Sequence, residues 1–389
     1  MIAAARFAAP RAPEGLSGAH GDLPVLGGTL AEAQERALTA AGARLGAPER
    51  GERLMVREDA LVTAHAARAL VAEGRKQKKD LAFSLGGRAG ELGELLGFGR
   101  PEPALVYLSG AGEASPERLA EAPRAALDPK ERALPVPVRG EQPVTLPISD
   151  LIAMPVGHWT QLLWGNLLAL GPHLWGALLG RHPALALARL GWAALRARSL
   201  HPARIAARVN RVGRGARVHP SAVVEASWLG EGAEVGAGAI VRGSVLAAGA
   251  VVEEQSYVEG MVMGARSRVQ RQCFIKYSVL GPDSAFAGAA QLSVLDRGAI
   301  VKYGAALMDM AFDRPVQVLV DRARAPVPFD MLGVCVGEGS VVSTGVSVAP
   351  GRVVPPGLTI LAGAGSLVRS LPEGARGVTE VRDGRLVSP

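Results

Sequence analysis

The sequence predicts a two-domain protein in which an α/β domain is followed by a three-sided β-solenoid. The chain has 389 residues, more than one domain usually holds, and 48% of them are hydrophobic, which is enough for two cores. Apolar residues of the second half recur with a period that belongs to neither a helix nor an isolated strand. We expect an α/β domain at 1–150, an apolar and then Arg-rich helical connector at 151–205, a β-solenoid at 206–370 with a loop insertion at 308–332, and a C-terminal tail at 371–389.

The composition excludes several classes of protein. The hydrophobic fraction is too high for a disordered chain, and 49 Gly with 27 Pro exclude a coiled coil. Two cysteines, Cys273 and Cys335, are too few for a disulfide framework or a structural zinc site, so we expect a reducing compartment. The first residues show no signal-peptide pattern. We therefore expect a cytoplasmic protein, with membrane association left open.

The net charge of +7 is unevenly distributed along the chain. No acidic residue lies between Asp150 and Glu225, whereas nine arginines lie between Arg181 and Arg217. Such a stretch fits nucleic acid, anionic lipid or a phosphorylated substrate. Aromatic residues do not interleave with the arginines as they do in single-strand binders, so nucleic acid is the least favoured of these partners.

The N-terminal half is predicted to alternate strands and helices. Residues 2–5 are expected to form the first strand, followed by a short glycine-containing loop at 15–18. Residues 30–41 are expected to form a helix because their apolar side chains follow helical spacing. Further strands are predicted at 54–62, 82–85 and 104–108, with the spacing of an α/β domain.

The connector begins with 30 uncharged residues, 151–180, which include three of the five tryptophans. Gly171-Pro172-His173 is predicted to split this stretch, and the piece before the split is too short to cross a bilayer alone. A second helix is expected at 183–198, where apolar residues alternate with arginines. Three interpretations stay open: a buried helix linking the domains, a helical hairpin over 159–198 lying on an anionic membrane surface, and a true span.

The β-solenoid is predicted from apolar residues that return with spacings of 6, 6 and 5. Each block of three spans 17 residues, and the repeat runs from Val212 to Leu280. A second run, in strict sixes, extends from Val336 to Ile360. A triangular coil explains the pattern, with one short strand and one inward apolar residue on each side and small residues beside it where the chain turns.

This repeat resembles that of the hexapeptide-repeat proteins, whose fold is a left-handed parallel β-helix. Members of that family form trimers around the helix axis, so the resemblance implies a homotrimer. It also implies that most of the repeated apolar residues form the core of the scaffold and carry no chemistry.

Three segments carry a narrower resemblance: 274–280 (FIKYSVL), 291–296 (QLSVLD) and 307–313 (LMDMAFD). They resemble segments of archaeal-type bifunctional sugar-1-phosphate nucleotidyltransferase/N-acetyltransferases. The resemblance places Lys276, Gln291, Asp309 and Asp313 in a cleft of the β-helix, and Lys302 is a further cation suited to a phosphate or carboxylate there. The family uses a histidine as general base where this chain has Gln291, which cannot accept a proton near neutral pH.

The same family has an N-terminal nucleotidyltransferase domain of the Rossmann-like α/β type, which the first half of this chain resembles. A glycine-rich loop binds the nucleotide phosphates in that family, and the resemblance gives this role to Gly15, Ser17, Gly18 and Asp22. An aspartate at a strand end holds Mg²⁺ in the family, and Asp59 stands in the matching position.

Three functions follow as alternatives. The resemblance implies a magnesium-dependent enzyme of sugar-nucleotide biosynthesis, which transfers a nucleotidyl group from a nucleoside triphosphate to a sugar 1-phosphate. The second alternative is a catalytically inactive trimeric relative that acts as a scaffold or regulator at the membrane surface. The third is an acyltransferase that uses a base other than histidine.

Overall fold

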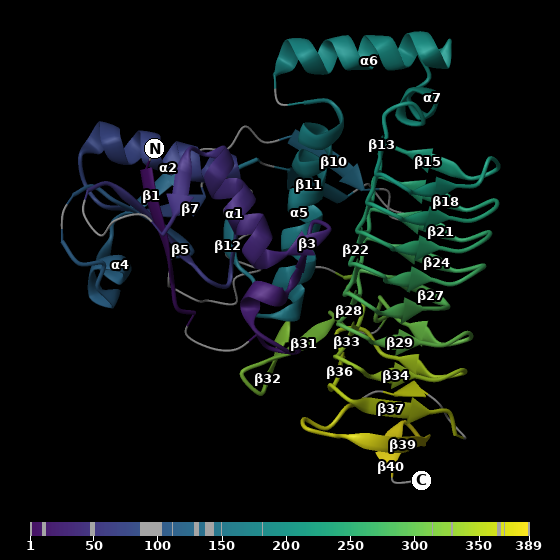
Figure 1. The fold of residues 1–389 in the computed structure, drawn as a ribbon. Helices are drawn as coiled ribbons and strands as arrows, with labels where there is room; N and C mark the ends of the chain where they lie inside the picture. The colour runs from purple at the N-terminus through teal and green to yellow at the C-terminus, as the bar shows by residue number, and fades with distance from the viewer. Residues whose placement is uncertain are drawn as a thin grey trace. The chain divides into compact units, whose positions relative to one another are not determined.

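The computed structural model describes residues 2–9, 13–46, 51–85, 103–110, 112–127, 132–136, 144–148, 150–180, 182–312, 314–327, 330–363, 367–368 and 370–387 (Figure 1). The chain forms two compact units. The first contains Met1–Pro13, Gly18–Leu23 and Thr29–Ala169, and the second contains Glu14–Ser17, Pro24–Gly28 and Leu170–Pro389. Two short N-terminal segments therefore belong to the second unit, although the sequence places them in the α/β domain.

A six-stranded mixed sheet forms the centre of the first unit, in the order β4-β1-β5-β8-β7-β9. Its strands are β1 (Ile2–Phe7), β4 (Ala43–Leu45), β5 (Arg53–Arg57), β7 (Leu81–Leu85), β8 (Leu105–Leu108) and β9 (Arg124–Leu127). Strand β8 is antiparallel to both of its neighbours, and the other pairings are parallel. The predicted strand at 54–62 is two strands, because Glu58 and Asp59 form a turn between β5 and β6 (Ala60–Val62).

Helices of the first unit begin where the local sequence supplies a cap. Helix α1 (Leu30–Ala40) starts with a capping box, in which Thr29 and Glu32 satisfy each other's backbone amides. Helix α2 (Ala64–Gln77) is capped by Thr63, and α4 (Pro116–Glu121) by Ser115. Smaller elements of the first unit are η1 (His20–Asp22), the hairpin of β10 (Arg132–Val136) and β11 (Val144–Ile148), and β12 (Ala153–Pro155), which pairs with β6. The hairpin of β2 (Pro24–Val25) and β3 (Gly28–Thr29) lies mostly in the segment that belongs to the second unit.

The connector folds as three helices: α5 (Trp159–Leu178), α6 (Pro183–Ala197) and α7 (Pro202–Ala206). The predicted split at 171–173 is wrong, because α5 continues through Pro172. The proline removes one backbone hydrogen bond of the helix, and Leu170 and Leu174 on either side of it are buried. No single helix in the described part of the chain is long and apolar enough to cross a membrane, and α5 with α6 meets that test only as a bent pair.

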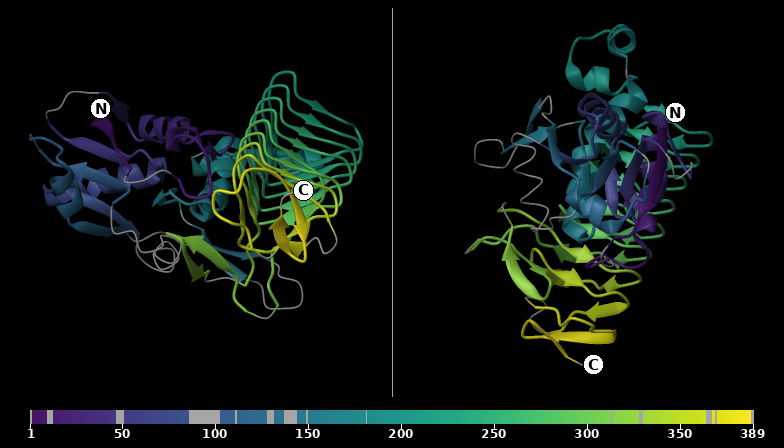
Figure 2. Two further views of the ribbon diagram at one scale, coloured as in Figure 1. Left: turned by 90° about the horizontal axis from the view of Figure 1, so that it is seen from below. Right: turned by 90° about the vertical axis from the view of Figure 1, so that its left-hand side faces the viewer.

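The second unit is a parallel β-solenoid with three sheets (Figure 2). The first sheet comprises β13 (Arg211–Val212), β16 (Trp228–Leu229), β19 (Val245–Leu246), β22 (Val262–Met263), β25 (Val279–Leu280), β28 (Val294–Leu295), β33 (Cys335–Val336) and β36 (Val353–Val354). The second comprises β14 (Arg217–Val218), β17 (Glu234–Val235), β20 (Val251–Val252), β23 (Arg268–Val269), β26 (Ala285–Phe286), β29 (Ile300–Val301), β34 (Val341–Val342), β37 (Leu358–Leu361), β39 (Gly377–Arg382) and β40 (Arg385–Val387). The third comprises β15 (Val223–Glu225), β18 (Ile240–Arg242), β21 (Tyr257–Glu259), β24 (Phe274–Lys276), β27 (Ala289–Gln291), β30 (Ala306–Leu307), β35 (Ser347–Val348) and β38 (Leu367–Val368).

The register of these sheets places each repeated apolar residue beside its equivalent on the next coil. Leu229 pairs with Leu246, and Val235 with Val252, each 17 positions further along the chain. These side chains are buried in one continuous core. The predicted β-solenoid is confirmed, and the parallel pairing of its coils fits a left-handed β-helix; the last strand, β40, alone pairs antiparallel, with β39, among the described strands of the three sheets.

Serine side chains support one corner of the solenoid from inside. Ser244 accepts a hydrogen bond at its Oγ from the Met261 amide at 3.0 Å, and its own amide donates to Ser227 Oγ at 3.1 Å. Ser278 and Ser293 repeat this link on later coils at 3.0 Å. Between β30 and β33 the chain leaves the coil and forms the hairpin of β31 (Gln317–Val320) and β32 (Ala323–Pro326).

Candidate functional site

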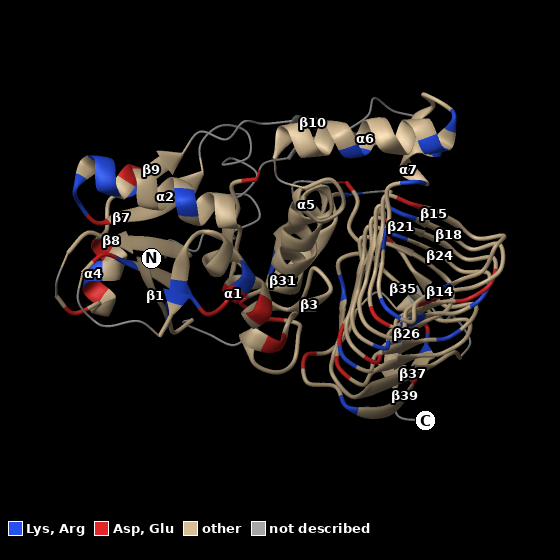
Figure 3. Cartoon of the chain, turned by 45° about the horizontal axis from the view of Figure 1, so that its top comes forward, with Lys and Arg blue, Asp and Glu red and all other residues tan. Residues whose placement is uncertain are grey.

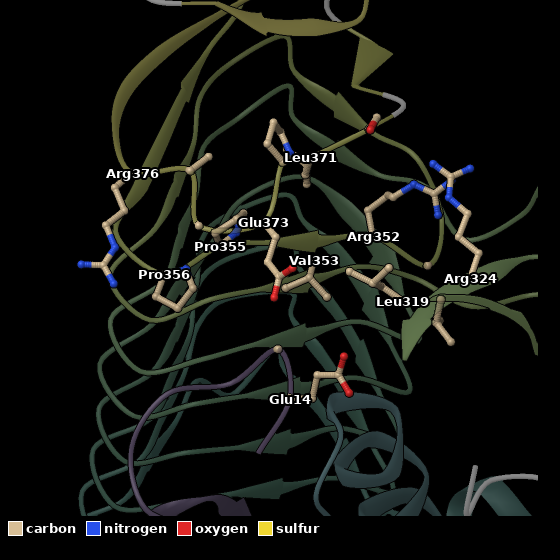
Figure 4. Close-up of a pocket in the computed structure, with 17 residues that line it drawn as sticks. Glu14, Leu319, Arg324, Arg352, Val353, Pro355, Pro356, Leu371, Glu373 and Arg376 are labelled. Atoms are coloured by element: carbon tan, nitrogen blue, oxygen red, sulfur yellow. The ribbon is translucent and has the colours of Figure 1, made fainter. Parts of the chain in front are cut away.

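The second unit contains a cavity of about 270 Å³ beside its last coils (Figure 4). Hairpin β31–β32 forms one wall, the residues before and after β36 form another, and the tail at 370–376 closes a third side. Glu14 and Gly15, which belong to the same unit, complete the lining. We name this space the arginine cavity, because Arg324, Arg352 and Arg376 line it together with apolar side chains such as Leu319 and Val353.

The hairpin is held close to the coil that carries Arg352. Arg352 Nη1 donates a hydrogen bond to the carbonyl oxygen of Gln317 on β31 at 2.9 Å. Gly351, with a φ of +72°, allows this approach, because a Cβ atom there would lie 2.4 Å from the same carbonyl oxygen. One wall of the cavity is therefore built by direct contact and has little freedom to shift.

Positive charge accumulates on one side of the cavity. Burial lowers the pKa of Arg352, and the neighbouring guanidinium groups of Arg324 and Arg314 lower it further. Figure 4 shows the side chains of Arg324 and Arg352 next to each other, with Arg376 on the opposite side. Since arginine keeps its proton at any working pH, these guanidinium groups keep their positive charge beside the cavity.

Two carboxylates face the same cavity and order its edges. Glu14 Oε1 accepts a hydrogen bond from the Asp321 amide in the hairpin turn at 3.2 Å. Glu373 Oε2 lies 3.5 Å from Arg322 Nε in an exposed ion pair. The guanidinium donors and the apolar wall suit a phosphate or carboxylate attached to a less polar body, whereas the two carboxylates contact the protein's own hairpin.

The predicted phosphate loop is divided between the two units. Gly15 and Ser17 belong to the solenoid unit, where the Ser17 amide donates to Asp296 Oδ2 at 2.8 Å and the Gly15 carbonyl accepts from Cys335 Sγ at 3.1 Å. Gly18 and Asp22 belong to the first unit. The Ser17 amide was expected to donate a hydrogen bond to a nucleotide phosphate, but it already donates one to a carboxylate of the solenoid.

Burial raises the pKa of Asp296 above its ordinary value, although the amides of Ser17 and Arg297 donate hydrogen bonds to its carboxylate. Burial also raises the pKa of the Cys335 thiol, and the charge of Asp296 raises it further. This cluster is a closed structural contact that fixes the N-terminal segment 14–17 to the coils.

Asp59, the predicted magnesium ligand, is fully buried in the turn between β5 and β6. Its Oδ1 atom lies 2.5 Å from Arg57 Nε, and both side chains have no exposed surface. Gln34 fixes the turn by donating from Nε2 to the carbonyls of Arg57 at 3.0 Å and Ala60 at 2.9 Å. A fully buried carboxylate that is paired with a guanidinium group is not available to bind magnesium in this conformation. Among the described residues, no group of three or more His, Cys, Asp and Glu side chains could hold a metal ion.

Lys276 lies in a charged column on the outer surface of the third sheet. The register aligns Glu225, Arg242, Glu259 and Lys276 on successive coils. Lys276 Nζ lies 3.1 Å from Glu259 Oε2. Burial alone would raise the pKa of Glu259, but hydrogen bonds from Tyr257 and Lys276 bring it below its ordinary value.

Aromatic rings cover the same lysine. Lys276 Nζ lies 4.9 Å from the ring centre of Tyr257 and 5.2 Å from that of Phe274, and the two rings stack 5.5 Å apart. Its ammonium group is thus held by a carboxylate and two aromatic faces, which is typical of a structural contact on the solenoid surface.

The structure brings three of the five predicted cleft residues together. Gln291 stands next to Lys276 in the register of β24 and β27, and its Nε2 donates to Asp309 Oδ2. Lys302 follows β29 on the second sheet and is exposed, so it lies apart from this group. Asp313 lies outside the described residues.

Sequence reasoning missed the arginine cavity and the charged column for different reasons. The column had a signal, since Glu225, Arg242, Glu259 and Lys276 repeat every 17 residues in step with the apolar core. The cavity had none, because Arg324, Arg352 and Arg376 come from a hairpin, a coil and the tail and share no motif.

No protein-family model and no curated protein matches the chain. Among solved structures, it is similar to a hexapeptide transferase family protein from Anaplasma phagocytophilum, at 14% identity and a TM-score of 0.24 over 46% of this chain and 77% of that chain. It is similar to the polysialic acid O-acetyltransferase OatWY at 12% identity and a TM-score of 0.18, over 46% of this chain and 87% of that chain. The acetyltransferase domain of PglB from Neisseria gonorrhoeae matches at 15% identity and a TM-score of 0.16, over 69% of this chain and 95% of that chain. At these identities and TM-scores the similarities assign no function to this chain.

Proposed function

We propose that this chain is a hexapeptide-repeat transferase that binds a phosphate-bearing small molecule, such as a nucleotide or a sugar phosphate, in the arginine cavity. The observation that carries the proposal is the position of Arg352, which is partly buried beside Arg324 and Arg314 in a cavity with an apolar wall. Guanidinium groups bind phosphate oxygens in pairs, and the apolar wall suits the body of a nucleotide or an acyl carrier.

Nucleotidyl transfer to a sugar 1-phosphate, which the family resemblance implies, would place the chemistry in the first unit. That reaction requires Asp59 to exchange Arg57 for magnesium, and the fully buried ion pair opposes this. Acyl transfer by the solenoid is consistent with the position of the cavity. It would need a proton acceptor other than Gln291, which cannot take a proton near neutral pH.

A scaffold without catalysis is the second candidate, and one observation favours it. Two of the groups predicted to bind the nucleotide or its magnesium already have partners within the protein: the Ser17 amide with Asp296, and Asp59 with Arg57. The trimer implied by the family resemblance is part of either proposal, and sedimentation equilibrium of the purified chain tests it directly.

The proposal is tested by isothermal calorimetry of the full chain with inorganic phosphate, UTP, a UDP-sugar, a sugar 1-phosphate and coenzyme A, each with and without magnesium. Arg324→Gln is the main variant, because the Arg324 side chain is exposed and its removal leaves the Arg352–Gln317 contact in place. The matched control is Arg214→Gln, an exposed arginine on the first coils.

We expect one or more of these phosphates to bind and Arg324→Gln to weaken that binding about 10-fold or more, since a hydrogen bond to a charged group contributes roughly 1.5–3 kcal/mol. Arg214→Gln should bind as the unchanged chain does. Absence of binding across the panel, or equal binding by both variants, would reject the arginine cavity as the ligand site. Magnesium-dependent binding that Arg324→Gln leaves unchanged would instead favour a nucleotide site in the first unit.

A further inference from the structure

Helix α6 exposes an apolar surface on its outer side. Leu187, Trp192 and Leu195 have 70%, 62% and 67% of their surface exposed, and Leu185 is exposed as well. Such a cluster is unusual for a water-facing helix, because large apolar side chains on surface helices normally point to the core.

The inner side of α6 is already packed, so the outer residues are not a displaced core face. Ala186 and Ala193, seven residues apart on one side of the helix, are only 4% and 3% exposed. At 100° per residue, Leu195 lies about 170° from this alanine stripe, and Leu187 and Trp192 lie about 110° from it on either side. The helix therefore contacts the protein through small side chains and presents its large apolar side chains to the surroundings.

Positive charge borders this apolar surface. Arg189 and Arg196 lie on one flank of α6, and Arg198 follows its last residue. Figure 3 shows α6 as an apolar helix with basic residues and no acidic ones. The sequence contains no acidic residue between Asp150 and Glu225.

We propose that α6 docks this protein on the surface of an anionic phospholipid bilayer. Leu187, Trp192 and Leu195 enter the boundary between headgroups and acyl chains, as the apolar face of an interfacial helix does. Trp192 suits this depth, because its ring is apolar and its indole N–H is polar. Arg189 and Arg196 reach lipid phosphates from the flank.

The charge of α6 favours an anionic bilayer over a second copy of the chain as its binding partner. Pairing two α6 helices would bring Arg189, Arg196 and Arg198 of both copies together with no carboxylate on either helix to offset them. An anionic lipid surface supplies the opposite charge over the whole length of the helix. Docking on the surface also fits the buried state of the first half of α5, in which Trp159–Asn166 are buried inside the protein.

The test is co-sedimentation of the full chain with two kinds of vesicle. One contains phosphatidylcholine alone, and the other contains phosphatidylcholine with roughly 30% phosphatidylserine, an anionic lipid that attracts basic segments. We expect binding to the anionic vesicles only, with loss of binding at high salt. Trp192→Gln with Leu195→Gln should reduce binding at least about 10-fold, since each buried apolar side chain contributes roughly 1.5–3 kcal/mol. Arg189→Gln and Arg196→Gln should each reduce it about 5-fold, from about 1 kcal/mol per basic residue near the surface.

Matched controls separate docking from general surface effects. Phe312→Gln removes an aromatic side chain that is 89% exposed on the solenoid unit, and Arg266→Gln removes an exposed arginine there; both should bind like the unchanged chain. Trp192→Phe keeps the apolar contact, so it should bind normally but lose fluorescence quenching by brominated lipid. Circular dichroism checks that each variant is folded.

Several results would overturn the proposal. These are equal binding to neutral and anionic vesicles, no binding to either, or unchanged binding by the Trp192/Leu195 double variant. Self-association that the same double variant abolishes would assign the surface to a second copy instead. None of these outcomes depends on whether phosphates bind the arginine cavity, so the two proposals fail separately.

Discussion

Replacing Asp59 with alanine is expected to destabilise the first unit and not merely to remove a metal ligand. Asp59 and Arg57 are both fully buried, and Asp59 Oδ1 lies 2.5 Å from Arg57 Nε. Removing the carboxylate leaves a buried guanidinium without the charge that offsets it. Breaking a buried ion pair in this way costs about 3–5 kcal/mol, which is a large fraction of the 5–15 kcal/mol that stabilises a typical domain.

Hydrogen–deuterium exchange followed by mass spectrometry measures this effect on each unit separately. A loss of about 3–5 kcal/mol corresponds to a roughly 10²- to 10⁴-fold fall in amide protection wherever exchange requires unfolding of the unit. Peptides covering β1, β5 and β8 should show this loss, whereas those from the solenoid coils should keep their protection. Asp150→Ala, an exposed aspartate in the same unit, is the matched control and should change stability by less than about 0.5 kcal/mol.

The double substitution Arg57→Met with Asp59→Leu separates charge from packing. It removes both buried charges, so most of the lost protection should return, because buried ion pairs exchanged for apolar residues of similar volume are often neutral. Unchanged protection in Asp59→Ala, together with loss of magnesium binding, would refute the ion-pair explanation and restore Asp59 as a metal ligand.

Three further predictions concern the solenoid. Phe286→Ala should destabilise it by about 3–5 kcal/mol in urea unfolding, because this ring is fully buried in the solenoid core; a cost below about 1 kcal/mol would contradict the packing described here. The pKa of Asp296 is higher in the folded than in the unfolded chain, so the contribution of this carboxyl to folding stability is greatest below the unfolded-state pKa and falls as pH rises through the folded-state pKa. An asparagine does not titrate. The Asp296→Asn variant should therefore gain stability relative to the unchanged chain as pH increases from about 4 to 7. A constant difference over this range would show that the carboxyl does not titrate as inferred. Cys335 should react with a thiol reagent far more slowly in the native than in the denatured protein, because burial removes access and raises its pKa; equal rates would show that the segment 14–17 does not cover it.

The solenoid was predictable because its information is local and repeated. One inward residue per side, as at Leu229, Val235 and Val241, recurs in step with the coil, so the sequence carries the periodicity of the structure directly. The strand at the N-terminus and helix α1 were also close to their predicted bounds, and the helix was predictable because the spacing of its apolar residues is a short-range signal.

The candidate site was much less predictable. The segment 15–18 has the glycine and serine of a phosphate loop, yet its neighbours along the chain do not reveal that Asp296 and Cys335 lie beside it. The arginine cavity escaped prediction for the same reason, since its three arginines line one space only when the hairpin and the tail fold against the coil. Local patterns report backbone geometry, whereas such sites depend on which distant segments meet.

By itself, the sequence determined the repeat, the β-solenoid and the uneven charge of the connector. Only the tertiary structure decided that Asp59 is enclosed with Arg57, and that the first half of α5 is buried while α6 presents Trp192 and Leu195 outward. The two helices have similar apolar composition, and this composition determines only how much apolar surface each helix has. Which part of that surface is covered depends on the segments that pack against it, and these are fixed only when the whole chain has folded.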